Sequence, residues 1–260
     1  MLRIEHIEDL KKSGLSDDMI SAMGIESMDG MQLAVGVQGV ALAKQAYAAH
    51  GYKIPYRTLS GDITKMCRYK VFWTEPTDDQ GNKKPKYLSA INQEPELYIP
   101  PGFDALMAKH DYVIVTEGEK KAARAVQEGI PCVGLAGVHM WADAYSRKVD
   151  KLMGRGMSHA TKPLKALEML ASSKRVLIVF DSDSATNPQV QAARYILKDA
   201  LLYHCAKWVR LIDLASPDPS VKYGLDDVLE NTDTKTVFLA QVQDALSQGS
   251  MNLAPLIKFA

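Results

Sequence analysis

Three carboxylates follow two short apolar runs of the chain at equivalent positions. Glu117 ends the run that begins at Tyr112, while Asp181 and Asp183 follow the run RVLIVF (175–180). Carboxylates held close together repel one another, and a hard divalent cation with oxygen ligands relieves that repulsion. We therefore expect a Mg²⁺ or Mn²⁺ site that supports phosphoryl or nucleotidyl transfer or phosphodiester cleavage.

Parallel strands are the elements that must position these carboxylates. From residue 103 onward, apolar runs alternate with helical patterns, which predicts a mostly parallel sheet with helices on both sides. The expected strands are 112–116, 132–135, 175–180 and 208–212, and the expected helices are 120–128, 189–204 and 236–246. The carboxyl ends of parallel strands share one edge, so Glu117, Asp181 and Asp183 should converge there, with Gly118 supplying the sharp turn into the next helix.

A purely structural interpretation competes with this metal site. Glu117 and Glu119 could complement the dipole of the helix that they precede. Asp181 and Asp183 could belong to a capped turn before the helix that follows Asn187. Each alternative explains one cluster alone, whereas the repetition of one pattern at two strand ends favours a shared site.

The first part of the chain has a different organisation. We expect a helical N-terminal region over 1–50, with Ser16 capping the second helix and Gly24 ending it. A small β-rich module is expected over 51–102, with strands in 52–57, 64–73 and 86–91 and a hairpin connection at 79–82. The α/β domain would then occupy 103–260 and include a C-terminal helical extension.

Positive charge is distributed unevenly, although 31 Lys and Arg balance 31 Asp and Glu to a formal net charge of zero. Segment 53–86 has eight basic against four acidic residues, and segment 139–175 has eight against three. Local surpluses of this kind bind phosphate backbones. Arg57, Arg68, Lys70 and Lys86 alternate with apolar residues, so some should share a strand face that binds single-stranded DNA or a nucleoside triphosphate. An ordinary charged outer face of a half-exposed sheet is the alternative.

Four ordered motifs resemble the TOPRIM domain, in particular the DnaG-primase-like family of replication-associated proteins from plasmids and phages. They are TEGEKKA (116–122), VGLAGV (133–138), FDSDSATNP (180–188) and KYGLDDVL (222–229). The resemblance implies an α/β fold of TOPRIM (Rossmann-like) type, in which helices flank a mostly parallel sheet, preceded by the small β-rich module and the N-terminal helices.

The resemblance also implies roles for single residues. Glu117 matches a general acid/base or metal-linked glutamate, and Asp181 and Asp183 match metal-binding aspartates. Asp226 and Asp227 would be additional carboxylates at the metal, with a helix N-terminal cap as the alternative. Lys120 and Lys121 stand where many TOPRIM proteins have an acid, and they either bind phosphate or face solvent.

The activity implied is Mg²⁺-dependent nucleotidyl transfer, as in primase-type primer synthesis on single-stranded DNA from nucleoside triphosphates during replication of a mobile element. A replicative helicase is the expected partner protein. A nuclease that uses water at the same site is one alternative. A non-catalytic accessory that binds nucleic acid or a helicase is another.

Cysteine and histidine spacing gives no sign of zinc. Cys67, Cys132 and Cys205 are scattered, and the six histidines form no pair at ligand spacing, so we expect no zinc and reduced thiols in a cytoplasmic protein. The hydrophobic content of 47% is ordinary for a globular protein. The longest nearly apolar stretch, 34–43, is far shorter than the ~20 residues that span a bilayer, so no membrane partner is expected.

Overall fold

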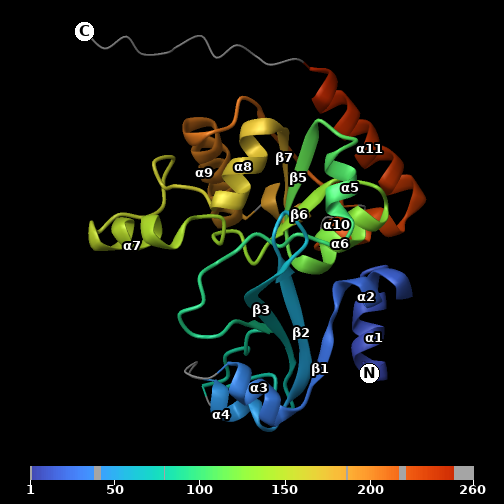
Figure 1. Cartoon of the computed structure of the whole chain (residues 1–260), viewed down its shortest axis with the longest axis vertical. Coiled ribbons are helices and arrows are strands. Elements are labelled where there is room, and N and C mark those ends of the chain that lie inside the picture. The colour runs from blue at the N-terminus through green and yellow to red at the C-terminus, as the bar shows by residue number, and fades with distance from the viewer. Residues whose placement is uncertain (1, 38–41, 79, 186, 217–220, 249–260) are drawn as a thin grey trace.

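The computed structural model describes residues 2–37, 42–78, 80–185, 187–216 and 221–248. It is a mixed α/β structure with two four-stranded sheets, one antiparallel and one parallel (Figure 1). The predicted α/β class with a parallel sheet flanked by helices is confirmed. No helix among the described residues is long and apolar enough to cross a membrane.

The N-terminal region forms two helices as predicted. Helix α1 (Ile4–Lys11) is followed by α2 (Asp17–Met23), whose first turn is capped by Ser16 through a hydrogen bond from the Met19 amide. Gly24 ends α2 in the left-handed conformation, at φ 67°. Strand β1 (Glu26–Met28) then pairs with the first sheet, so the segment before residue 50 contributes a strand that the sequence patterns did not reveal.

The antiparallel sheet has the order β1-β2-β3-β4. Its remaining strands are β2 (His50–Arg57), β3 (Ile63–Phe72) and the short β4 (Tyr87–Leu88). Helices α3 (Gly30–Gly36) and α4 (Ala43–Ala46) pack on one face around a small core. The predicted hairpin turn includes Asp79, which lies outside the described residues, although Thr77 and Lys83 bridge on either side of it.

The second sheet is parallel throughout and has the order β6-β5-β7-β8. Its strands are β5 (Tyr112–Glu117), β6 (Cys132–Leu135), β7 (Arg175–Val179) and β8 (Val209–Ile212), close to the predicted ranges. Their side chains are almost all buried, which explains why the sequence reads as continuous apolar runs.

Helices cover both faces of the parallel sheet (Figure 1). Helices α8 (Lys165–Ser173) and α9 (Pro188–His204) lie on one side, and α5 (Phe103–Met107), α6 (Glu119–Gln127), α10 (Leu225–Glu230) and α11 (Thr232–Ser247) on the other. Helix α11 begins four residues before the predicted start because the Asn231 side chain accepts the amides of Asp233 and Thr234. The long connection between β6 and β7 contains α7 (Ala144–Leu152) as well as α8.

One continuous core joins the two sheets. It contains Leu10 and Ile20 of the N-terminal helices, Tyr52 and Tyr56 of β2, and the apolar residues of the parallel sheet. The antiparallel sheet is therefore packed directly against the α/β part of the molecule, and residues of β3 can reach the edge where the parallel strands end.

Candidate active site

The strand order places Glu117 and Asp181 side by side. Strand β5 pairs with β6 on one side and β7 on the other, so the chain reverses its direction of travel across the sheet at β5. Glu117 is the last residue of β5, and Asp181 follows β7 after Phe180. At such a switch point the loops diverge and leave a crevice, which is where ligands bind in open α/β sheets.

Gly118 allows the chain to leave β5 and enter α6 within one residue. Its φ of 103° and ψ of 145° are essentially restricted to glycine. Its amide donates to the Leu135 carbonyl over 2.8 Å, and its carbonyl accepts the Ala122 amide. The turn therefore fixes Glu117 relative to the neighbouring strand β6.

Two lysines neutralise the aspartates that follow β7. The Lys121 ammonium lies 2.5 Å from Asp181 Oδ1, and Lys222 lies 3.1 Å from Asp181 Oδ2 and 2.9 Å from Asp183 Oδ2. Asp181 is almost fully buried, and Asp183 is part of the 3-10 turn η1 (Ser182–Ala185). The sequence motifs predicted that Glu117, Asp181 and Asp183 meet at one edge of the sheet, which we call the carboxylate edge. The structure adds a lysine ammonium group beside each of the two aspartates.

Glu117 belongs to the same electrostatic cluster. Burial raises the pKa of Glu117, and the neighbouring charges of Asp181 and Asp183 also raise it, against the lowering effect of Lys121 and Lys222. Burial works to lower the pKa of Lys222, but the two aspartates outweigh it and the pKa is raised. The three carboxylates and two ammonium groups thus influence one another directly.

The two acidic residues of α10, Asp226 and Asp227, have different surroundings. Asp227 is exposed and accepts the Gly224 amide over 2.8 Å, which is the capping role considered as the alternative. Asp226 is half-buried and lines a pocket together with Glu117 and Lys121. The structure therefore brings Asp226, rather than Asp227, to the carboxylate edge.

The backbone at Gly224 approaches this edge closely. A Cβ atom at that position would lie 2.6 Å from Asp226 Oδ1, 2.7 Å from Lys121 Cε and 3.4 Å from Asp181 Oδ1. The Ser182 amide donates to the Tyr223 carbonyl, and the Tyr223 amide donates to the Ser182 hydroxyl, each over 2.8 Å. The segment KYGLDDVL is thereby fixed against the turn that carries Asp181 and Asp183.

A pocket of about 180 Å³ connects the carboxylate edge with the antiparallel sheet. Acidic, basic and aromatic side chains contribute to its wall. The lining residues are Arg68, Tyr87, Glu117, Gly118, Glu119, Lys120, Lys121, Ala136 and Asp226. The pocket therefore combines groups that could bind a cation with groups that could bind phosphate.

Arg68 forms the link between the two sheets. Its Nη1 donates to Glu119 Oε1 over 3.0 Å and to the Ala136 carbonyl over 2.7 Å. The same Glu119 oxygen accepts the Tyr56 hydroxyl over 2.6 Å, and the guanidinium lies 4.9 Å from the centre of the Tyr87 ring. Glu119 is 2% exposed, so this second glutamate of the motif TEGEKKA is a buried anchor for β2 and β3.

Lys70 and Lys120 extend the positive charge beyond Arg68. Lys70 lies over the Tyr87 ring at 4.8 Å, and Lys120 donates to Asp9 of α1 over 3.1 Å. Burial lowers the pKa of Lys70, as do the positive charges of Lys120 and Lys86, whereas Asp9 raises it. Lys86 is exposed. Four of the six predicted basic residues (Arg68, Lys70, Lys86, Lys120) thus surround one region, and Lys121 lies next to it against Asp181.

Arg57 is separate from this group. Tyr52 pairs with Lys70 and Ile54 with Arg68, so the even-numbered residues of β2 share a face with these two basic residues, and the alternation of the strand places Arg57 on the opposite face. Its guanidinium donates to the Ala22 and Gly61 carbonyls. Arg57 lines a different cavity of about 630 Å³.

The chemistry of the donor set fits a hard divalent cation. Glu117, Asp181 and Asp183 offer carboxylate oxygens, the ligands that Mg²⁺ and Mn²⁺ prefer. Within the described part of the chain, these three do not form a group whose ligand oxygens all lie within 4.8 Å of one another. Such an open arrangement suits Mg²⁺, which keeps several water ligands and uses only one or two carboxylates.

Three site residues could not be selected from the sequence. Lys222 lies in a recognised motif, but its pairing with aspartates 39 and 41 positions earlier depends on how α10 packs on α6. The sequence around Asp9 shows only the periodicity of a helix, which does not single out this residue. Glu119 could be explained equally well as a charge that complements the helix dipole. The one available signal was the clustering of charged residues within the motifs themselves.

A family model described as "Domain of unknown function (DUF3854)" matches residues 103–236. No curated protein matches the chain. Among solved structures, the chain is similar to the DnaG primase catalytic domain bound to ssDNA, with a TM-score of 0.55 and 16% identity over 92% of this chain and 71% of the other.

Two further primase structures are similar. The structure of the DnaG catalytic core gives a TM-score of 0.55 and 17% identity, covering 93% of this chain and 72% of the other. The RNA polymerase domain of Mycobacterium tuberculosis primase DnaG gives 0.54 and 14%, covering 93% and 75%. At these identities the likeness concerns the fold alone.

Proposed function

The chain belongs to the family described as "Domain of unknown function (DUF3854)", and for this member we propose Mg²⁺- or Mn²⁺-dependent nucleotidyl transfer on nucleic acid. In its most specific form, the activity is primase-type primer synthesis on single-stranded DNA. One observation carries the proposal: Glu117, Asp181 and Asp183 gather at the switch point of a parallel sheet, next to a pocket lined by Arg68, Lys120 and Lys121.

The fold also supports the proposal of nucleotidyl transfer. The similar solved structures are catalytic parts of DnaG primases, one of them bound to single-stranded DNA. Their likeness extends over more than nine tenths of this chain and includes the antiparallel sheet as well as the parallel one. The activity itself rests on the carboxylate edge and on the TOPRIM-like motifs.

Glu117, Asp181 and Asp183 would hold the divalent cation, with Asp226 near enough to contribute. When bound, the cation supplies Lewis acidity toward a phosphoryl oxygen and favours deprotonation of an attacking hydroxyl. Asp181 and Asp183 form ion pairs with Lys121 and Lys222. The Lys222 side chain is 52% exposed, so a substrate phosphate can reach its ammonium group from solvent.

The basic residues would bind the phosphates of template and nucleoside triphosphate. Lys120 and Lys121 line the pocket itself, so a triphosphate that enters it meets two ammonium groups beside the carboxylate edge. Lys86 is exposed at the sheet edge and can contact a single-stranded backbone. Arg68 is already engaged by Glu119 and the Ala136 carbonyl, so its main role is to position the antiparallel sheet against the pocket.

The biological setting belongs to the proposal as well. Replication of a plasmid or phage in the cytoplasm, together with a replicative helicase, follows from the resemblance of the motifs. The division of the chain into an N-terminal region, a basic β-rich module and a TOPRIM domain is also part of the proposal. A nuclease would use the same carboxylates with water as the nucleophile.

A single assay separates primer synthesis from cleavage. The protein is incubated with Mg²⁺ or Mn²⁺, labelled single-stranded DNA and separately labelled ribo- and deoxyribonucleoside triphosphates, and the products are resolved by length. New labelled oligonucleotides that depend on Asp181 support the primase, and shortened DNA that depends on Asp181 supports the nuclease. Products that persist in Asp181→Ala, or the absence of both products with either metal, would overturn the catalytic proposal.

A further inference from the structure

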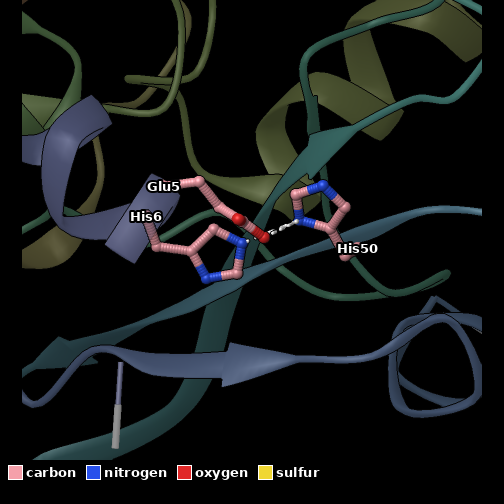
Figure 2. Close-up of side chains that lie close together, drawn as sticks. All are labelled: Glu5, His6 and His50. Carbon is pink, nitrogen blue, oxygen red and sulfur yellow. Dashed lines mark hydrogen bonds and ion pairs between the residues drawn. The ribbon is translucent and has the colours of Figure 1, made fainter. Parts of the chain in front are cut away.

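Three residues from distant parts of the chain converge beside the antiparallel sheet, away from the carboxylate edge. Glu5 and His6 lie on α1, and His50 begins β2. His6 Nε2 lies 2.9 Å from His50 Nδ1, and His50 Nδ1 lies 3.4 Å from Glu5 Oε1. Figure 2 shows both rings and the carboxylate directed toward one point between them.

This cluster is distinctive within the described residues. It is the one group of three or more His, Cys, Asp or Glu residues there whose ligand atoms all lie within 4.8 Å of one another. His6 is fully buried, while the side chains of His50 and Glu5 are 34% and 52% exposed. An ion could therefore enter from solvent past these two accessible side chains and reach the buried His6.

A second layer of contacts orients the buried ligand. His6 Nδ1 lies 2.8 Å from Ser27 Oγ, which also accepts the Arg3 amide. The Ser27 hydroxyl oxygen has two lone pairs, so it can accept from both the Arg3 amide and a protonated His6 Nδ1. In that tautomer, His6 Nε2 is unprotonated and directs its lone pair toward the cluster. A hydrogen bond that fixes the second nitrogen of a histidine is the usual support of a metal ligand.

The distances are close to those of a tetrahedral site. With metal–nitrogen and metal–oxygen bonds of about 2.0–2.2 Å, neighbouring ligand atoms of a tetrahedral site lie about 3.3–3.6 Å apart. Two of the three separations, 2.9 and 3.4 Å, lie within a few tenths of an ångström of this range, and the third is within 4.8 Å. Two imidazoles and a carboxylate are also a ligand set typical of zinc.

We propose that Glu5, His6 and His50 form a Zn²⁺ site with one position open to water, which cross-links α1 to the antiparallel sheet. The expectation of no zinc rested on spacing along the sequence, and this site joins residues 44 positions apart. The proposal is independent of the chemistry at the carboxylate edge.

The position of the cluster suggests what the cross-link would do. Helix α1 also carries Asp9, which accepts the Tyr52 hydroxyl over 2.7 Å and binds Lys120 of the pocket. An ion that ties α1 to β2 would therefore hold Asp9 and Lys120 in place. Without an ion, His6 and His50 form an ordinary hydrogen bond with each other. Both imidazole rings stack on Phe72, with 5.2 Å between the ring centroids.

Cobalt absorption distinguishes these two interpretations. Tag-free, chelator-treated full-length protein is titrated with Co²⁺, whose visible bands intensify in tetrahedral sites, and Zn²⁺ is then added. We expect one equivalent of Co²⁺ to produce these bands and Zn²⁺ to abolish them. Zn²⁺ should also raise the melting temperature, because a ligand that binds only the folded state stabilises it.

Matched variants assign the signal to the cluster. His50→Gln should abolish the bands and the shift in melting temperature, and Glu5→Gln should weaken binding at least tenfold. Ser27→Ala should weaken it by about 10- to 100-fold through the second layer. His139→Gln changes an exposed histidine elsewhere and should leave binding unchanged.

The proposal fails under two results. One is the absence of tetrahedral bands in the wild-type protein at excess Co²⁺. The other is equal binding by the wild type and the folded His50→Gln variant, which would show that the ion binds elsewhere. Neither result depends on nucleotidyl transfer, so the zinc site and the catalytic proposal stand or fall separately.

Discussion

Glu119 shows how a single residue can connect chemistry and architecture. Its carboxylate is buried and accepts from Tyr56 of β2 and Arg68 of β3, while the preceding Glu117 faces the candidate metal site. The two glutamates of one short motif therefore have opposite tasks. In the proposed mechanism Glu117 offers charge to a ligand, whereas Glu119 holds the antiparallel sheet beside it.

Glu119→Gln should destabilise the protein by about 3 kcal/mol, because removing one partner of a buried ion pair leaves the other charge uncompensated. Arg68 would keep its bond to the Ala136 carbonyl but lose its counter-charge. Urea denaturation measures the effect. Glu8→Gln, the same change at an exposed position of α1, should stay within about 0.5 kcal/mol of the wild type. Equal stability of the two variants would show that Glu119 is not an anchor.

At the scale of elements, helix α1 is fastened to the rest of the molecule through Asp9. Burial alone would raise the pKa of Asp9, but Lys120 and the Tyr52 hydroxyl outweigh it, so the pKa is lowered below its ordinary value of 3.8. A carboxyl group whose pKa is lower in the folded than in the unfolded state stabilises the folded state at pH values above its unfolded-state pKa. The stabilisation is lost as the pH falls through the folded-state value.

Asp9→Asn should therefore cost about 1–3 kcal/mol at neutral pH, because it leaves the half-buried Lys120 ammonium without its anion. The difference between wild type and variant should shrink as the pH falls below 3.8 and Asp9 becomes protonated. Urea denaturation over a pH series measures both free energies of unfolding. A difference that stays constant across that range would contradict the role of the Asp9 charge.

At the scale of the whole molecule, zero net charge conceals a separation of charge. Acidic groups gather where the parallel strands end, and Arg68, Lys70, Lys86 and Lys120 lie on the adjoining side. A nucleic acid would then be held by local contacts. The salt dependence of binding reports how many such contacts form.

Three phosphate contacts, from Lys70, Lys86 and Lys120, predict a slope of about −2 for log K against log salt on single-stranded DNA. Lys86→Gln should weaken binding and make the slope shallower by about 0.7. Fluorescence anisotropy with a labelled oligonucleotide measures both quantities. Lys44→Gln alters an exposed lysine of α4, beyond the far face of the antiparallel sheet, and should change neither. Identical slopes for wild type and Lys86→Gln would remove Lys86 from the binding surface.

The sequence allowed prediction of those features that depend on local pattern. Apolar runs followed by acids predicted β5, β7 and the shared edge, because strands buried on both faces leave a continuous hydrophobic signal. The capped helix α2 followed from Ser16 and Gly24 for the same local reason. The predicted strand at 86–91 was too long, since only Tyr87–Leu88 pairs with β3.

Features that depend on packing between distant segments could not be predicted. The pairing of Lys222 with Asp181, the burial of Glu119 and the approach of His6 to His50 join residues 41, 63 or 44 positions from their partners. The register that pairs Ile54 with Arg68 places Arg57 on the face opposite the basic group, and the register between two strands cannot be deduced from the alternation of either strand alone. Periodicity shows which face of an element is buried, but not what covers it.

Extension of a defined primer tests the central claim most directly. An end-labelled RNA primer on a single-stranded DNA template is incubated with Mg²⁺ or Mn²⁺ and nucleoside triphosphates, and single-nucleotide additions are timed. The wild type should extend the primer. Asp181→Asn should be slower by at least about 100-fold, while Asp199→Asn, the same change on an exposed part of α9, should match the wild type. Extension by Asp181→Asn at the wild-type rate would contradict the assignment of nucleotidyl transfer to the carboxylate edge.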